Sequence, residues 1–193
     1  MQRSSREMHL IIKTNRQLDL QELIRRCVSD TPDAQKLLFE KFVTPMARLC
    51  IRYLKDHDVA QDVLMEGFMK VFDRLKHFEY QGKHSLGMWI RKIMVNECLM
   101  MLRKDRTRLF VNLTDKHVEV NEIVEDHIVT DDILALIDHL PAGYRTVFNL
   151  YAIDGYSHKE IAALLDISES ASRSQLTHAR SKLKELLRKH GWT

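Results

Sequence analysis

The sequence predicts an all-α fold of two small helical domains joined by a flexible acidic linker. Apolar residues recur with the 3.6-residue period of an amphipathic helix through most of the chain. The chain has six glycines and three prolines in 193 residues. Together they make up about 5% of the chain, whereas average usage is roughly 12%. They are too few for the many tight turns of a barrel or sandwich. A central stretch is acidic and lacks the helical period, and a chain of this length favours one medium domain or two small ones.

The first domain is expected over residues 18–105, after an N-terminal extension of residues 1–17. Thr31-Pro32 is typical of a helix start, because proline suits the first turn. Pro45 lies inside the second helix and predicts a kink or break near Val43. A polar loop with two of the six glycines should cover residues 78–87. The four helices are expected at about residues 20–28, 32–55, 59–77 and 86–104.

Residues 106–130 are expected to form the linker. Between Thr114 and Asp132 the chain has seven acids against one base, Lys116, whereas the sequences on both sides are basic. A basic–acidic–basic order suggests two polyanion-binding parts joined by a segment that avoids DNA. The alternative is that the Val and Ile residues of this stretch pack locally.

The second domain, residues 131–193, contains the clearest local motif, a helix-turn-helix within a four-helix unit. Ser157 and Glu160 form a capping box at the start of a short helix. A turn at Asp166 follows, and Ser168 or Ser170 caps the next helix. We expect that helix to bury Leu176, Ala179 and Leu183, and to present a polar, basic face to the major groove of DNA. An ordinary helical hairpin with a solvated basic face is the plainer alternative.

Other chemistry does not assemble in the sequence. Three scattered cysteines suit a reducing compartment and argue against a disulfide framework or a zinc site. We find no catalytic triad, no histidine metal motif and no glycine-rich phosphate loop, so neither an enzyme nor a bound metal or cofactor is expected. The only apolar run near the N-terminus is too short for a signal peptide, and no stretch could span a bilayer. We therefore expect a cytoplasmic protein.

Two sets of motifs follow one another along the chain. The first set is Asp62-Val63-x-x-Glu66-x-Phe68-x-Lys70-Val71-Phe72 and Gly82-x-x-Ser85-Leu86-x-x-Trp89-Ile90-x-x-Ile93-x-Val95-Asn96. The second set is Leu140-Pro141-x-x-Tyr144-Arg145-x-Val147-Phe148, Gly155-Tyr156-Ser157-x-Lys159-Glu160-Ile161-Ala162, Ile167-Ser168-Glu169 and Ser174-x-Leu176-x-x-Ala179-Arg180. In this order they resemble the second and fourth conserved regions of bacterial sigma factors of the extracytoplasmic-function type, over about residues 20–104 and 131–190. About 25 linker residues leave no room for the extra domain of the primary sigma factors.

The resemblance implies a protein, monomeric when free, that binds core RNA polymerase, recognises promoter DNA and helps to open it. It also implies an anti-sigma factor as a partner. The third helix would dock on the coiled coil of the polymerase clamp, and the following loop would open the −10 element and hold a flipped base. Such a site needs aromatic rings and cations. The residues implied are Asp62, Met65, Glu66 and Phe68 for core polymerase; Phe78, Tyr80, Lys83, His84, Trp89, Arg91, Lys92 and Asn96 for −10 DNA; and Arg173, Ser174, Gln175 and His178 for −35 DNA.

Several of these assignments have plainer alternatives. Phe68 lies on the apolar face of its helix and could be core, and Trp89 could be a core anchor. His178 stands where the family commonly has arginine, which puts the usual −35 sequence in doubt. For the whole chain, the alternatives are a dimeric DNA-binding regulator with a helical sensing domain, and an all-helical interaction protein or small enzyme. A dimeric regulator has no reason to carry the motifs between residues 62 and 96.

Overall fold

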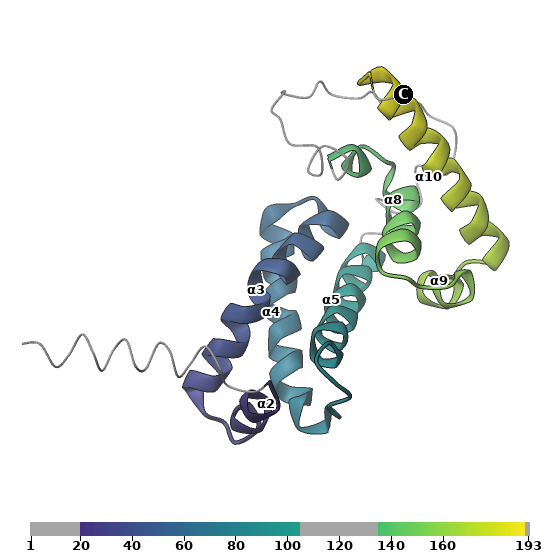
Figure 1. Cartoon of the computed structure of the whole chain (residues 1–193). Coiled ribbons are helices and arrows are strands. Elements are labelled where there is room, and N and C mark those ends of the chain that lie inside the picture. The colour runs from purple at the N-terminus through teal and green to yellow at the C-terminus, as the bar shows by residue number, and fades with distance from the viewer. Residues whose placement is uncertain (1–19, 105–134, 192–193) are drawn as a thin grey trace, which may run out of the picture.

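The structure, a computed structural model, describes residues 20–104 and 135–191, which form two helical units (Figure 1). The all-α, two-unit prediction is confirmed, while the exact domain boundaries stay predictions. The N-terminal unit contains α2 (Leu20–Val28), α3 (Pro32–Leu54), α4 (His57–Arg74), the 3₁₀ turn η1 (Leu75–His77) and α5 (Ser85–Lys104). The C-terminal unit contains helical residues 135–138, α8 (Ala142–Phe148), the π-helical turn η3 (Asn149–Ile153), α9 (His158–Leu165) and α10 (Glu169–Lys189).

The N-terminal unit is a bundle in which α3, α4 and α5 pack against one another and α2 covers one end of α3 (Figure 1). Its largest fully buried side chains include Leu38, Tyr53, Phe68 and Met94. Gly67 lets α4 and α5 approach closely, since a Cβ there would lie 2.4 Å from Sδ of Met94. The apolar stripes read from the sequence therefore meet in one core.

Helix boundaries in this unit follow local chemistry. Asp56 caps α4, because its carboxylate accepts hydrogen bonds from the amides of Asp58 and Val59 at 3.1 Å. The helix thus begins two residues before the predicted start at Val59. α3 continues without interruption through Pro45, so the predicted break near Val43 is absent, and the alternative of a kink there stays a prediction. Proline removes one backbone donor, but buried residues on both sides of it hold the helix against its neighbours.

The C-terminal unit contains the predicted helix-turn-helix, with α9 and α8 packed on α10. The capping box of α9 is complete: the Ser157 hydroxyl accepts from the Glu160 amide, and the Glu160 carboxylate accepts from the Ser157 amide at 2.8 Å. Asp166 adopts the left-handed conformation (φ 56°, ψ 50°) that the tight turn requires. Ser168 caps α10 by accepting from the Ala171 amide.

Two segments that the sequence analysis predicted lie outside the described residues: the N-terminal extension, residues 1–17, and the acidic linker, residues 106–130. Among the helices that the structure describes, none combines the length and apolar character needed to cross a membrane.

Candidate nucleic-acid interface

One face of α4 is exposed and combines acids with methionines. Asp62, Met65 and Glu66 are all exposed, as expected for a docking surface. Met69, which the sequence analysis did not single out, extends the same face and is 66% exposed. Residues three and four apart share a helix face, so these four side chains form one surface, here called the α4 surface.

Phe68 does not belong to the α4 surface, which corrects the sequence prediction. Its side chain is only 2% exposed, and its ring packs against Phe39 at a centroid distance of 4.7 Å and against Phe72 at 6.3 Å. The helical period places it opposite the exposed acids, in the bundle core. Its alternative role as a core residue is therefore the one that the geometry supports.

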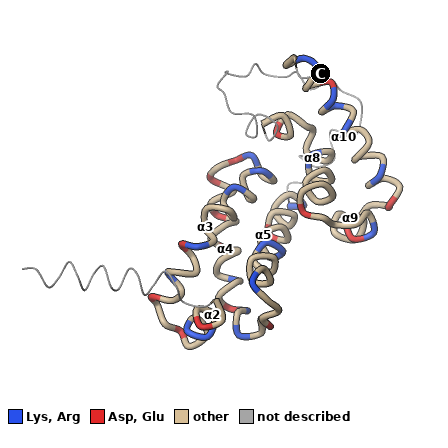
Figure 2. The backbone as a smooth tube through the Cα atoms, in the orientation of Figure 1, with Lys and Arg blue, Asp and Glu red and all other residues tan. Residues whose placement is uncertain are grey.

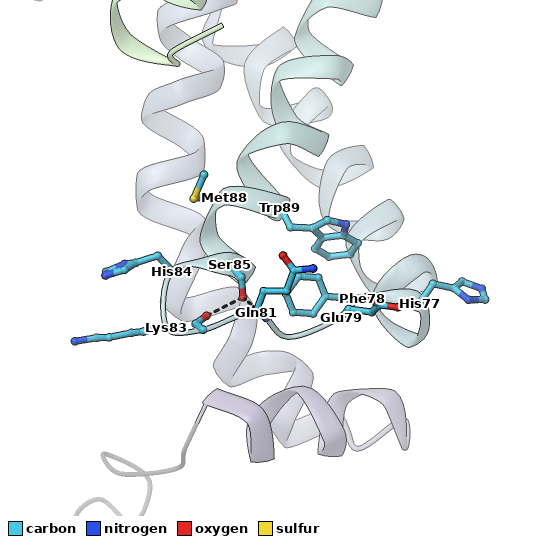
Figure 3. Close-up of a pocket in the computed structure, with 10 residues that line it drawn as sticks. His77, Phe78, Glu79, Gln81, Lys83, His84, Ser85, Met88 and Trp89 are labelled. Carbon is cyan, nitrogen blue, oxygen red and sulfur yellow. Dashed lines mark hydrogen bonds between the residues drawn. The ribbon is translucent and has the colours of Figure 1, made fainter.

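The loop between η1 and α5 forms an open pocket of about 610 Å³ with an aromatic wall (Figure 3). The rings of Phe78 and Trp89 lie 5.0 Å apart at a tilt of 47°. The Ser85 hydroxyl holds the loop by donating to the Gly82 carbonyl at 2.7 Å and accepting from the Gln81 amide. The pocket is lined by His77, Phe78, Glu79, Gln81, Gly82, Lys83, His84, Ser85, Met88 and Trp89.

The pocket brings together only half of the residues predicted for −10 DNA. Phe78, Lys83, His84 and Trp89 line it, and Figure 3 shows that the Lys83 and His84 side chains extend away from the two rings. The other four predicted residues are not part of its wall. Tyr80 is half-buried against the bundle core, Arg91 is paired with an acid of the C-terminal unit, and Lys92 and Asn96 lie further along α5.

The exposed face of α10 carries some of the residues predicted for −35 DNA. Arg173 and Ser174 are exposed in its first turns, and further bases follow along the helix (Figure 2). His178 is exposed but stacks on Tyr144 of α8, with ring centroids 5.5 Å apart. Thr177, which the sequence analysis did not name, lies at the centre of this exposed face, because Ser170, Ser174 and Ser181 surround it at helical spacing.

Gln175 was predicted to point outward, and this placement is wrong. The side chain is 8% exposed, because it lies beside Ser172, Leu176 and Ala179 on the side of α10 that packs against α8 and α9. Ser172 is fully buried, and its hydroxyl is hydrogen-bonded to Nδ1 of His158 at 2.9 Å. A polar pair therefore joins α9 and α10.

The titratable side chains of the described residues are not arranged as a group of catalytic residues. Burial raises the pKa of the Cys27 thiol to about 11, which keeps it protonated and unreactive. A hydrogen bond to Cys50, together with burial, raises the pKa of Cys98. The Ser157 hydroxyl bonded to Glu160 lowers the pKa of that exposed carboxyl, in keeping with a capping role. Residues 20–104 and 135–191 contain no group of three side chains able to hold a metal ion.

Comparison with known protein families shows to which family this chain belongs. A family model described as "Sigma-70 region 2" matches residues 38–108, and one described as "Sigma-70, region 4" matches residues 130–183. The chain belongs to the sigma-70 family. The two matches together cover well over half of the chain, in the order that the sequence motifs predicted, and relatives named as ECF sigma factors identify the type.

Relatives align along most of this sigma factor. The ECF RNA polymerase sigma-E factor of Haemophilus influenzae is 25% identical over 86% of this chain and 94% of its own length. The ECF sigma-E factor of Salmonella typhimurium is 27% identical over 90% and 98%. SigE of Mycolicibacterium smegmatis is 27% identical over 74% of this chain, and the match spans 57% of that relative. A solved structure of CnrH in complex with the cytosolic domain of CnrY is similar, with a TM-score of 0.48 and 22% identity over 86% of this chain and 96% of that one.

Proposed function

We propose that this protein binds core RNA polymerase through the α4 surface and directs it to promoters, where it helps to open the −10 element and reads the −35 element with α10. The observation that carries the proposal is the presence of both sigma-70 regions in one chain, each with an exposed surface at the position that its region would use. Family membership also favours an anti-sigma factor as an inhibitory partner.

The α4 surface suits a protein partner rather than DNA. Asp62 and Glu66 would repel phosphates, whereas the exposed Met65 and Met69 can bury apolar surface against a protein partner. Methionine is unbranched and adapts to irregular surfaces. Four side chains of this kind on one helix favour docking against a basic, partly apolar surface of the polymerase.

The pocket at the start of α5 suits an unpaired base. A base leaving the stack costs a few kcal/mol, which a protein offsets by stacking and by hydrogen bonds to the base edge. Trp89 and Phe78 provide the aromatic wall, and Gln81 and Ser85 lie beside it with polar groups. The exposed Lys83 and His84 are placed to follow the phosphates that lead into the pocket.

The helix-turn-helix suits the major groove. Its second helix exposes Arg173, Ser174 and Thr177 within its first turns, where side chains reach base edges. Arginine can pair with guanine through two hydrogen bonds. Lys184 and Arg188 follow near the end of α10 and would meet the DNA backbone or solvent. The alternative of a dimeric DNA-binding regulator is disfavoured, because it does not explain why residues 38–108 match sigma-70 region 2.

A charge-reversal experiment tests the core-binding step. Asp62→Lys with Glu66→Lys should abolish binding to core polymerase while the C-terminal unit still binds DNA. Asp33→Lys with Glu40→Lys, which reverses two exposed acids of α3, is the matched control and should bind core normally. Unchanged affinity of the α4 double variant, or equal loss in the control, would remove α4 from the interface.

A further inference from the structure

Methionine is the main apolar residue on the described surface. Six large apolar side chains are exposed in residues 20–104 and 135–191, and four of the six are methionines. All four lie on α4 or α5 of the N-terminal unit, and they are Met65, Met69, Met88 and Met100. A thioether is the one apolar side-chain group that mild oxidants convert into a polar one. The surface of this unit therefore offers several positions for that conversion.

Met65 and Met69 differ from the other two because they are neighbours on the α4 surface. They lie four residues apart on one helix, so their Cβ atoms are about 5–6 Å apart. Their exposed fractions are 49% and 66%. Met88 instead lines the pocket at the start of α5 (Figure 3), and Met100 lies near the end of that helix. Two thioether sulfurs thus share the surface that is proposed to dock on core polymerase.

The other sulfur atoms of the described residues are less accessible. Met46 and Met94 are buried in the bundle core, and Met101 is partly buried. All three cysteines are buried. The raised pKa of Cys27, about 11, leaves little thiolate at neutral pH, and the thiolate is the form that oxidants attack. An oxidant in solution therefore meets the exposed methionines before it meets a reactive cysteine.

We propose that Met65 and Met69 form a reversible oxidation site, at which a peroxide lowers the affinity of the protein for core polymerase. The inference rests on the proposed function, because it takes the α4 surface as the core-binding surface. A sulfur lone pair attacks one oxygen of hydrogen peroxide, so that an S–O bond forms and the O–O bond breaks. The sulfur loses two electrons and the peroxide gains them. The leaving hydroxide takes the proton of the transferred oxygen and departs as water.

The charges beside the two methionines favour a neutral oxidant. Asp62 and Glu66 are exposed on the same face of α4. Two carboxylates produce a negative potential that lowers the local concentration of anions. Hydrogen peroxide carries no charge, and Met65 and Met69 are exposed without any rearrangement of the fold. A peroxide is therefore the class of oxidant that this site admits.

Oxidation changes what the α4 surface can bury. Methionine sulfoxide is polar, whereas methionine is a flexible apolar side chain. In the free protein both sulfoxides would be solvated, so the fold should keep its stability. Against the apolar part of a partner, a sulfoxide oxygen without a donor is costly, and Asp62 and Glu66 offer no donor when ionised. The lower end of that cost corresponds to about a fivefold loss of affinity.

Peptide mass spectrometry of the full chain during a peroxide time course tests whether the site exists. Met65 and Met69 should be oxidised well before Met46 and Met94, because only the first pair is exposed. The melting temperature of the chain should stay the same when the first pair is fully oxidised. Bound core polymerase should slow the oxidation of Met65 and Met69. Equal oxidation rates for the exposed and buried pairs would overturn the inference.

Core-binding measurements with two matched variants test the consequence. Each variant is compared with itself before and after peroxide treatment, so an effect of the substitution on untreated affinity cancels. The parent, and the control Met88→Leu with Met100→Leu, should lose affinity at least about fivefold. Met65→Leu with Met69→Leu should lose none, and any effect of oxidised Met88 or Met100 would appear in this variant. If it binds core too weakly for measurement, the single variants replace it, and each should lose less than the parent.

Recovery and failure of binding have distinct meanings. Methionine sulfoxide reductases for both epimers should restore the affinity of the oxidised parent. Equal losses in the two double variants, or a loss that the reductases do not reverse, would overturn the inference. Unchanged binding after both methionines of α4 are oxidised would overturn it as well, while the proposed function would stand. If the untreated parent does not bind core polymerase, the proposed function fails, and this inference fails with it.

Discussion

Replacing Phe68 by alanine should destabilise the N-terminal unit, although the family motif places this residue in a polymerase-binding helix. The ring is 2% exposed and packs 4.7 Å from Phe39 and 6.3 Å from Phe72. Alanine at this position would remove the buried Phe68 ring from the core of the helical bundle and leave a cavity. The adjacent Met69 provides the matched control, because it lies on the same helix and is 66% exposed.

The size of the effect follows from burial. Phe→Ala at a fully buried site costs about 3–5 kcal/mol, and loss of the aromatic pair with Phe39 places the value in the upper part of that range. In a domain of 60–100 residues, 1 kcal/mol lowers Tm by about 4–8 °C. The described N-terminal unit spans residues 20–104, so Phe68→Ala should lower its Tm by at least about 12 °C. Met69→Ala should change Tm by no more than about 4 °C, because substitutions at exposed sites stay within about 0.5 kcal/mol.

Calorimetry and core-binding assays separate the two roles of α4. Phe68→Leu keeps part of the buried volume and should melt between the parent and Phe68→Ala, which keeps the test informative if the alanine variant does not fold. At a temperature where Phe68→Leu is folded, it should bind core polymerase normally, whereas Met69→Ala should bind more weakly. A normal Tm for Phe68→Ala, or a specific binding defect in folded Phe68→Leu, would refute the assignment of Phe68 to the core.

Three further outcomes are expected. Phe78→Ala, which removes one ring of the aromatic wall of the pocket, should leave closed complexes largely intact but reduce permanganate reactivity of the −10 region, since base–aromatic stacking is worth about 1–3 kcal/mol per base. Normal reactivity would contradict the assignment of the pocket to an unpaired base. Arg173→Ala should relax the sequence preference for the −35 element in a selection experiment. Lys184→Ala should keep that preference and reduce the slope of log affinity against log salt concentration by about 0.9. A reversal of these two results would show that the wrong residues are placed in the groove. Ser157→Ala should cost about 0.5–2 kcal/mol in denaturant unfolding, because an N-terminal cap is lost; no change would mean that the cap is not needed.

Local patterns predicted the helices well, because each boundary has a local cause. The capping box at Ser157 and the left-handed turn at Asp166 are determined by a few neighbouring residues, and both are present. Pro45 shows where local reasoning stops. Its missing amide favours a break, but packing of the long helix against α2, α4 and α5 outweighs one lost hydrogen bond.

The site residues were harder to predict, since exposure depends on which elements pack together. Phe68 was assigned from a family motif, although the helical period already placed it on the apolar face. Gln175 is polar, and nothing in its own turn of helix reveals that α8 and α9 cover it. The pairing of Arg91 with Asp154 joins residues 63 positions apart in different units. No periodic pattern contains such a contact, so only the three-dimensional arrangement shows it.

Binding to core RNA polymerase tests the central claim most directly. The full chain, without any inhibitor, is mixed with purified core polymerase from the same organism, and complex formation is measured by size-exclusion chromatography. The two sigma-70 regions and the α4 surface predict a stoichiometric complex that opens promoter DNA, and that the Asp62→Lys, Glu66→Lys variant does not form. Separate elution of the parent chain and core polymerase would contradict the account.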